Sequence, residues 1–264
     1  MSLDAVNAVN WSAIPNPTQQ QWDDPEGVAH ALRLLTTSTT ANETGSAAAA
    51  LANGGFVRGH AGMVFPAAYA ATPVLLDLIE HGRRPRIKEA ALGLLEDTLA
   101  YFPLTGYERV DTSYGTGIPL CCAIARHIRG RRSALLAHQK HGKRLRAEAE
   151  LHWWMTIEET ELHPDGTRTA LATLEGTPFG TPVEAELHSP LSERPTTAVW
   201  IDALTTDASG AAYIQLGQTP SEPLPRSTLC PAECVRREQR PRRHVSTAGP
   251  QPHRIERGNS GGSR

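Results

Sequence analysis

The sequence predicts an α+β protein in which helical hairpins come first and a small antiparallel β-sheet follows. Three features support this fold class. Apolar residues recur at helical spacing over residues 24–150, apolar and polar residues alternate over 151–217, and proline, serine and arginine dominate 218–264. The polar residues 1–23 predict a flexible N-terminus, and the last segment predicts a disordered basic tail.

The charged residues are distributed unevenly along the chain. The 264 residues carry a formal net charge of −2, yet residues 235–264 contain eight arginines and only two glutamates. The remaining residues therefore carry a net charge of −8. Such an acidic body favours a basic protein partner, whereas an arginine-rich tail favours an acidic protein or a nucleic acid. No aromatic residues alternate with these arginines, so nucleic acid is the less favoured partner.

The first helix is marked by its capping residues. Asp24 is a favourable N-cap, Pro25 suits the first helical position, and apolar residues follow at positions i, i+4 and i+7. A polar loop over 36–46 and a short alanine-rich helix that ends at Asn53 come next. This part of the chain therefore predicts two helices joined by a loop.

Residues 63–79 form an apolar run that contains two prolines. The run is shorter than the roughly 20 residues that a membrane-spanning helix needs, and charged residues follow it closely, so we expect no membrane span. Proline is tolerated in the first turn of a helix but disrupts a helix interior. Pro73 therefore predicts a break between two short helices, at 60–71 and 73–81.

Residues 72–100 resemble a HEAT-type helical repeat. The first helix begins at Pro73, and the basic-apolar pair Arg86-Ile87 precedes the apolar face of the second helix. The apolar residues of the two helices are Leu75, Leu76, Leu78, Ile79, Ala90, Ala91, Leu94 and Leu95. The order Arg-Ile-Lys departs from the usual repeat, in which an apolar residue precedes the basic one. A weaker copy of the repeat covers residues 118–142.

Helical repeats of this kind stack into extended surfaces used for recognition. The chain is similar to the HEAT-like proteins that bacteria pair with toxins as immunity proteins. This resemblance implies a cytoplasmic, non-enzymatic protein-binding module that neutralises a cognate toxin by binding and occlusion. It implies no catalytic residue and no cofactor. The N-terminus has neither the basic nor the apolar region of a secretory signal, which agrees with a cytoplasmic location.

An 18-residue segment without helical periodicity, 102–119, separates the two repeat-like regions. Loops of this length inside a folded region are often functional. The segment mixes aromatic and charged side chains, a composition common in protein-recognition sites. We therefore predict a partner-binding site formed by Tyr107, Glu108, Arg109, Asp111 and Tyr114. The alternative is a capping loop that shields the ends of the helices.

Alternation of apolar and polar residues predicts the β-sheet. It begins at Trp153 and predicts a hairpin whose turn is formed by 163–167, with Gly166 in the left-handed region. Further strands are predicted at 182–189, 196–206 and 211–217. Trp153 and Trp154, at the helix-to-sheet junction, are expected to pack in the core.

The four cysteines predict neither a metal site nor a disulfide. Cys230 and Cys234, with His244, form the only grouping that hints at metal, but a C-x₃-C pair supplies only half of the four ligands of a structural zinc site. Cys121 and Cys122 are adjacent in sequence and cannot easily bind the same ion. We therefore expect reduced thiols, no metal and no cofactor.

Catalytic motifs are absent from the sequence: it contains no nucleophile-elbow pattern and no glycine-rich phosphate loop, so we predict no catalytic residue. Two alternatives to an immunity protein stay open. One is a scaffold or regulatory protein that contacts nucleic acid or an acidic partner through the arginine tail. The other is an enzyme with a site at the helix–sheet junction, which a pocket joining Asp111, His152 and Glu158 would support.

Overall fold

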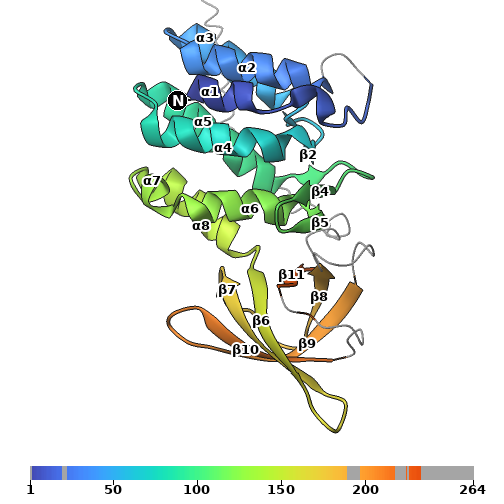
Figure 1. Ribbon diagram of the computed structural model, residues 1–264. Helices are drawn as coiled ribbons and strands as arrows, with labels where there is room; N and C mark the ends of the chain where they lie inside the picture. The colour runs from blue at the N-terminus through green and yellow to red at the C-terminus, as the bar shows by residue number, and fades with distance from the viewer. Residues whose placement is uncertain (1, 20–22, 189–196, 218–223, 225, 233–264) are drawn as a thin grey trace, which may run out of the picture.

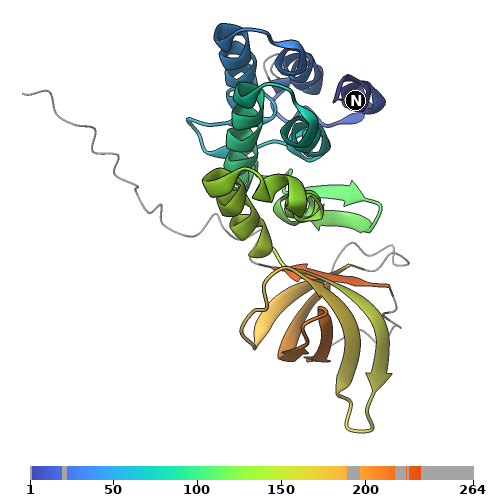
Figure 2. The same ribbon diagram turned by 90° about the vertical axis from the view of Figure 1, so that its left-hand side faces the viewer.

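The computed structural model describes residues 2–19, 23–188, 197–217, 224 and 226–232. Within these residues, helices form stacked layers in the first part of the chain, and a closed β-barrel follows them (Figure 1). The barrel lies below the last helical layer, at the end opposite the N-terminal helices (Figure 2).

The N-terminal layer consists of α1 (Ser2–Ala8), the 3₁₀ helix η1 (Trp11–Ala13), α2 (Pro25–Thr37) and α3 (Ala41–Ala52). Asp24 caps α2 as predicted, because its carboxylate accepts the N–H of Glu26 at 3.2 Å. Helix α3 begins inside the predicted polar loop, since Thr40 and Glu43 form a capping box. The segment expected to be flexible contains α1 and η1, and the Trp11 side chain is buried.

The predicted break at Pro73 is wrong, because a single helix, α4 (Ala67–His81), runs through this proline. Helix α5 (Pro85–Ala100) follows it and begins at the predicted proline. A proline in a helix interior costs about 3 kcal/mol. The five large aliphatic side chains that follow Pro73 in α4 are buried, and each stabilises the fold by about 1.5–3 kcal/mol. Burial of this apolar face therefore outweighs the cost of the proline.

The helical layer next to the barrel contains α6 (Leu120–Gly130), α7 (Arg132–Leu136) and α8 (Gln139–Glu150). Stacked helix pairs are the arrangement that a HEAT-like chain requires, and membership of that family stays a prediction. Among the described residues, no helix has both the length and the apolar character needed to cross a bilayer.

The segment 102–119, predicted to be a loop, contains short strands. It holds β3 (Phe102–Pro103) and a hairpin of β4 (Arg109–Thr112) and β5 (Gly115–Pro119). Strand β3 completes a small sheet with β1 (Val57–Arg58) and β2 (Met63–Val64). Figure 2 shows the β4–β5 hairpin beside α6 and above the barrel. This position places the hairpin at the boundary between the helices and the barrel.

The C-terminal sheet closes into a barrel of six antiparallel strands in the order β10-β7-β6-β11-β8-β9. The strands are β6 (Trp154–Leu162), β7 (Arg168–Glu175), β8 (Val183–His188), β9 (Thr197–Thr206), β10 (Ala211–Leu216) and β11 (Thr228–Pro231). The predicted β6–β7 hairpin is confirmed, and Gly166 in its turn has a φ of +85°.

The predicted fold class, helical hairpins followed by a small sheet and a disordered tail from residue 218, is wrong in its C-terminal half. Strand β11 lies inside that predicted tail and pairs with β6 on one side and with β8 on the other. All four of its residues are buried. The strand is short, but it satisfies the backbone hydrogen bonds of two neighbouring strands and so closes the barrel. Residues 233–264 of the predicted tail lie outside the described residues.

Side chains of β8 and β11 alternate between the barrel interior and the helical layer. Ala185 and Leu187 of β8 and Leu229 of β11 belong to the barrel core. Cys230 belongs instead to an apolar cluster shared with α6. Strands with this alternation are buried on both faces, because the helices cover the outer face.

Candidate functional site

The helices and the barrel meet at a junction formed by the start of α6, the β4–β5 hairpin and the strands β6, β8 and β11. Its apolar residues are Ile118, Cys121, Cys122, Ala123, Trp154 and Cys230. Three of them come from the first turn of α6, and Trp154 and Cys230 come from the barrel. The junction is therefore a packed interface that only the folded chain brings together.

An ion pair between Arg109 of β4 and Glu186 of β8 crosses this junction. The guanidinium binds both carboxylate oxygens, with Nη1 2.8 Å from Oε2 and Nη2 2.7 Å from Oε1. The hydrogen bonds to Glu186 raise the pKa of Arg109 above its ordinary value. Burial alone would raise the pKa of Glu186, but hydrogen bonds from His188 and Arg109 hold it below its ordinary value. This pair of charges therefore links the hairpin to the barrel.

A buried cluster of thiols and imidazoles lies beside this ion pair. The Cys230 Sγ atom is 3.4 Å from His188 Nε2, and the Cys230 thiol also forms a hydrogen bond with the Cys122 side chain. Although burial alone would lower the pKa of His188, hydrogen bonds with Cys230 and Glu186 raise it to about 9. Burial raises the pKa of Cys230, but the hydrogen bonds outweigh it and the net shift is downward. These shifts favour a thiolate–imidazolium pair.

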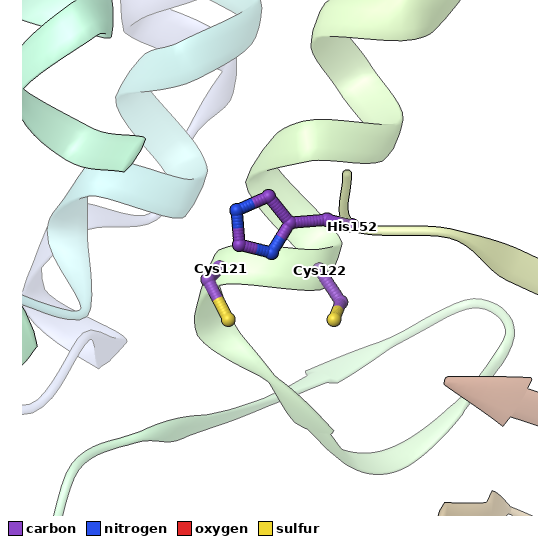
Figure 3. A group of neighbouring side chains, drawn as sticks. All are labelled: Cys121, Cys122 and His152. Carbon is purple, nitrogen blue, oxygen red and sulfur yellow. The ribbon is translucent and has the colours of Figure 1, made fainter. Parts of the chain in front are cut away.

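Two groups of three side chains in the junction have the atom types and spacing of metal ligands. Cys121, Cys122 and His152 form one group, around the start of α6 (Figure 3). Glu186, His188 and Cys230 form the other. In each group the ligand atoms all lie within 4.8 Å of one another, and all six residues are buried.

A cavity of about 480 Å³, called the arginine cavity below, is lined in part by Trp154. Its lining includes Arg126, Arg129, Arg131 and Arg132. The Arg126 guanidinium carbon is 3.7 Å from the centre of the Tyr114 ring and 4.6 Å from that of Trp154, which are cation–π distances. Part of the cavity lining is therefore formed by the Arg126 guanidinium and the two aromatic rings that it contacts.

Arg126 and Arg129 share one carboxylate, that of Glu175 on β7. Arg126 Nη2 is 3.0 Å from Glu175 Oε1, whereas Arg129 Nη2 is 3.9 Å from Oε2 and too distant for a hydrogen bond. The Arg129 side chain is only 7 % exposed, and burial lowers its pKa. Burial, together with Arg126 and Arg131, also lowers the pKa of His127, which lines the same cavity. The cavity is therefore electropositive, because four arginines and two glutamates, Glu150 and Glu175, line it.

The five side chains predicted to bind a partner all lie in or near the β4–β5 hairpin, but they have different surroundings. Arg109 binds Glu186 and Tyr114 packs on Trp154 at a ring distance of 5.9 Å, so both contribute to the junction. Glu108 accepts the Gly106 N–H at 2.8 Å, and Asp111 accepts that of Gly117 at 2.9 Å. Tyr107 is half-buried. A partner-binding role for these residues stays a prediction.

The residues named for the enzyme alternative are not brought together. His152 is buried beside the cysteines of α6, whereas Glu158 is exposed on β6 and accepts a hydrogen bond from Thr173 at 3.3 Å. None of Asp111, His152 and Glu158 lines the arginine cavity. The Cys230 and Glu186 side chains approach the same ring nitrogen of His188, at 3.4 Å each. A nucleophile–base–carboxylate relay needs the two ring nitrogens to have different partners.

Sequence reasoning missed the residues that define this site. Cys122, His188 and Cys230 come from α6, β8 and β11, and only the barrel brings them into contact. The sequence had suggested Cys230 as a possible metal ligand only together with Cys234 and His244, and these two residues lie outside the described residues. The sequence does contain one signal, because Glu186 and His188 are two positions apart in a predicted strand and so lie on the same face of it. The structure shows that both side chains are buried.

The comparisons with known proteins gave no match: no protein family, no curated protein and no solved structure matches this chain.

Proposed function

We infer that this is a binding protein that holds an anionic group, a phosphate or a carboxylate, in the arginine cavity. One observation carries this proposal. Arg126 Nη1 and Arg129 Nε and Nη2 are buried and have no hydrogen-bond acceptor among the described residues, and both arginines line the cavity. These are N–H groups in the geometry that phosphate and carboxylate oxygens bind.

The energetics favour an anion at this position. A buried donor without an acceptor costs about 1–3 kcal/mol, and a hydrogen bond to a charged group contributes about 1.5–3 kcal/mol. Two carboxylates line the cavity, but Glu150 is paired with Arg146, so Arg126 and Arg129 share Glu175 and keep an excess of one positive charge. An anion would supply both the missing acceptors and the missing charge.

Isothermal titration with inorganic phosphate and with citrate tests the proposal and separates phosphate from carboxylate chemistry. Arg129→Gln should weaken binding about 10–100-fold, the effect of losing one charge-assisted hydrogen bond. Glu175→Gln should strengthen binding, because it removes the carboxylate that competes for both arginines. Arg144→Gln is the matched control, since Arg144 is exposed on α8 and outside the cavity lining. Equal affinity in all four proteins, or no binding of either anion, would refute the proposal.

A second candidate function is recognition of a basic protein on the outer face of the barrel. Leu171 of β7 and Tyr213 of β10 are register partners, and they are 45 % and 53 % exposed. Glu159 and Glu161 of β6 line the same shallow depression. An exposed apolar pair with an acidic rim fits a basic partner, because charge complementarity speeds association and gives specificity.

The immunity hypothesis is best tested at this depression on the outer face of the barrel. Co-expression with the products of neighbouring genes should relieve the toxicity of one of them, and Tyr213→Glu should abolish the relief. A chain that ends at residue 232 should keep it. If truncation abolishes the relief of toxicity and Tyr213→Glu leaves it intact, the result would favour the alternative of a scaffold protein that binds its partner through the arginine tail. The cytoplasmic location belongs to the same hypothesis, and it agrees with the absence of a disulfide among the three cysteines of the described residues.

A further inference from the structure

We propose that Cys122, Glu186, His188 and Cys230 bind one Zn²⁺ ion, and that this ion joins the helical layer to the barrel. The four side chains come from α6, β8 and β11. Cys122 and Cys230 are fully buried, and His188 and Glu186 are 1 % and 8 % exposed. Thiolate, imidazole and carboxylate groups are all zinc ligands, and four of them are the number that a tetrahedral site needs.

The distances between the ligand atoms fit one ion. Zinc binds sulfur at about 2.3 Å and nitrogen or oxygen at about 2.0–2.1 Å, so tetrahedral neighbours lie about 3.6 Å apart for S and N and about 3.3 Å for N and O. Here Cys230 Sγ is 3.4 Å from His188 Nε2, and that nitrogen is 3.4 Å from Glu186 Oε2. Two of the three distances among these ligand atoms therefore already match those that a shared ion imposes, and the third, between the Cys230 sulfur and the Glu186 carboxylate, is within 4.8 Å.

Cys122 supplies the fourth ligand from the helical side. Its thiol forms a hydrogen bond with the Cys230 side chain, so the two sulfurs are already neighbours. It lies in the first turn of α6, where the helix dipole favours the thiolate that zinc requires. Cys121 is the competing sulfur, because its ligand atom lies within 4.8 Å of those of Cys122 and His152, and separate substitution of each cysteine distinguishes the two.

An outer hydrogen-bond partner is present for Glu186, whereas the buried Nδ1 atom of His188 has no hydrogen-bond partner among the described residues. Arg109 holds both oxygens of Glu186, and metal-bound carboxylates are usually fixed by such a hydrogen bond. The charges balance when the ion binds, because Zn²⁺ and the Arg109 guanidinium offset two thiolates and one carboxylate. Binding would release two protons to solvent, one from the Cys122 thiol and one from the His188 imidazolium. A buried site with this composition is neutral with the ion bound.

The test is metal analysis of the full-length chain, purified without chelators and under reducing conditions. We expect about one zinc per chain. Replacement by Co²⁺ should give the absorption of a tetrahedral ion with sulfur-to-metal charge transfer from two thiolates. Cys122→Ser and Cys230→Ser should each halve the charge-transfer intensity and weaken zinc binding at least about tenfold. Cys121→Ser is the matched control and should change neither quantity.

Three results would overturn the assignment. The first is a wild-type protein that takes up neither Zn²⁺ nor Co²⁺. The second is a Co²⁺ spectrum without thiolate charge transfer. The third is a loss of metal in Cys121→Ser with Cys230→Ser unaffected, which would place the ion in the group of Cys121, Cys122 and His152. If a serine variant fails to fold, the thiolate count from the wild-type Co²⁺ spectrum still decides the question.

Discussion

Replacing Leu229 with alanine tests whether β11 is part of the barrel core. The Leu229 side chain is fully buried and lies between Met155 of β6 and Leu187 of β8. The substitution removes three carbon atoms, for which the transfer term is about 2.4 kcal/mol at about 0.8 kcal/mol per buried methylene. The neighbours belong to a closed barrel that cannot collapse far into the space, so a cavity term adds to this value. We expect a loss of about 3–4 kcal/mol, within the range of core leucine-to-alanine changes.

The assay is urea unfolding followed by tryptophan fluorescence, since Trp153 and Trp154 lie at the top of the barrel. With a slope of about 2 kcal/mol/M, the midpoint should fall by about 1.5–2 M. Leu171→Ala is the matched control, because Leu171 is on the barrel but 45 % exposed, and its loss should stay within about 0.5 kcal/mol. If the two variants have the same midpoint, β11 does not contribute to the core and the closed barrel is wrong.

Three further outcomes are expected. A chain that ends at residue 217 should lack the cooperative unfolding of the barrel, whereas a chain that ends at 232 should keep it; equal transitions in urea would contradict the role of β11. Burial raises the pKa of Asp97, against a hydrogen bond from Tyr101, so its ionisation opposes folding. Asp97→Asn should therefore gain stability over the wild type as the pH rises above the ordinary Asp range, and a constant urea-midpoint difference between the two proteins would refute this. Burial and two arginines lower the pKa of His127, and a bound anion should raise it. Sulfate should consequently bind more tightly as the pH falls from about 7.5 to about 5.5, and calorimetry of His127→Gln should show a smaller pH dependence.

Local signals in the sequence predicted many helices and strands correctly. The N-cap at Asp24 and the apolar face behind it located α2, and the left-handed Gly166 located the β6–β7 turn. Each depends on residues within one turn of helix or one hairpin, so neighbouring side chains decide the structure. The prediction at Pro73 was wrong because proline disfavours a helix interior locally, whereas burial of the apolar face of α4 favours a continuous helix. That burial depends on the packing of the helical layers, which the local sequence does not show.

The candidate site was not predictable in the same way. Arg109 and Glu186 are 77 residues apart in sequence, and Cys122 and Cys230 are even further apart. No periodic pattern relates such positions, because their contact depends on how the barrel closes. Tyr114 and Arg109 were singled out for their composition, and the structure places both at the junction. Composition therefore drew attention to the β4–β5 hairpin, whereas the residues that it contacts across the junction could not be predicted.

The position of β11 in the barrel has a consequence for the order of folding. The strand is the last of those in the described residues but lies in the middle of the sheet order, between β6 and β8. Until it inserts, β6 and β8 each present an open edge, and open edges pair readily with other chains. Domains fold in the order of synthesis, so the helical layers form first and an unclosed sheet follows them. During that interval the chain depends on a four-residue segment to prevent edge-to-edge association, and the rate of its insertion should govern the yield of native protein.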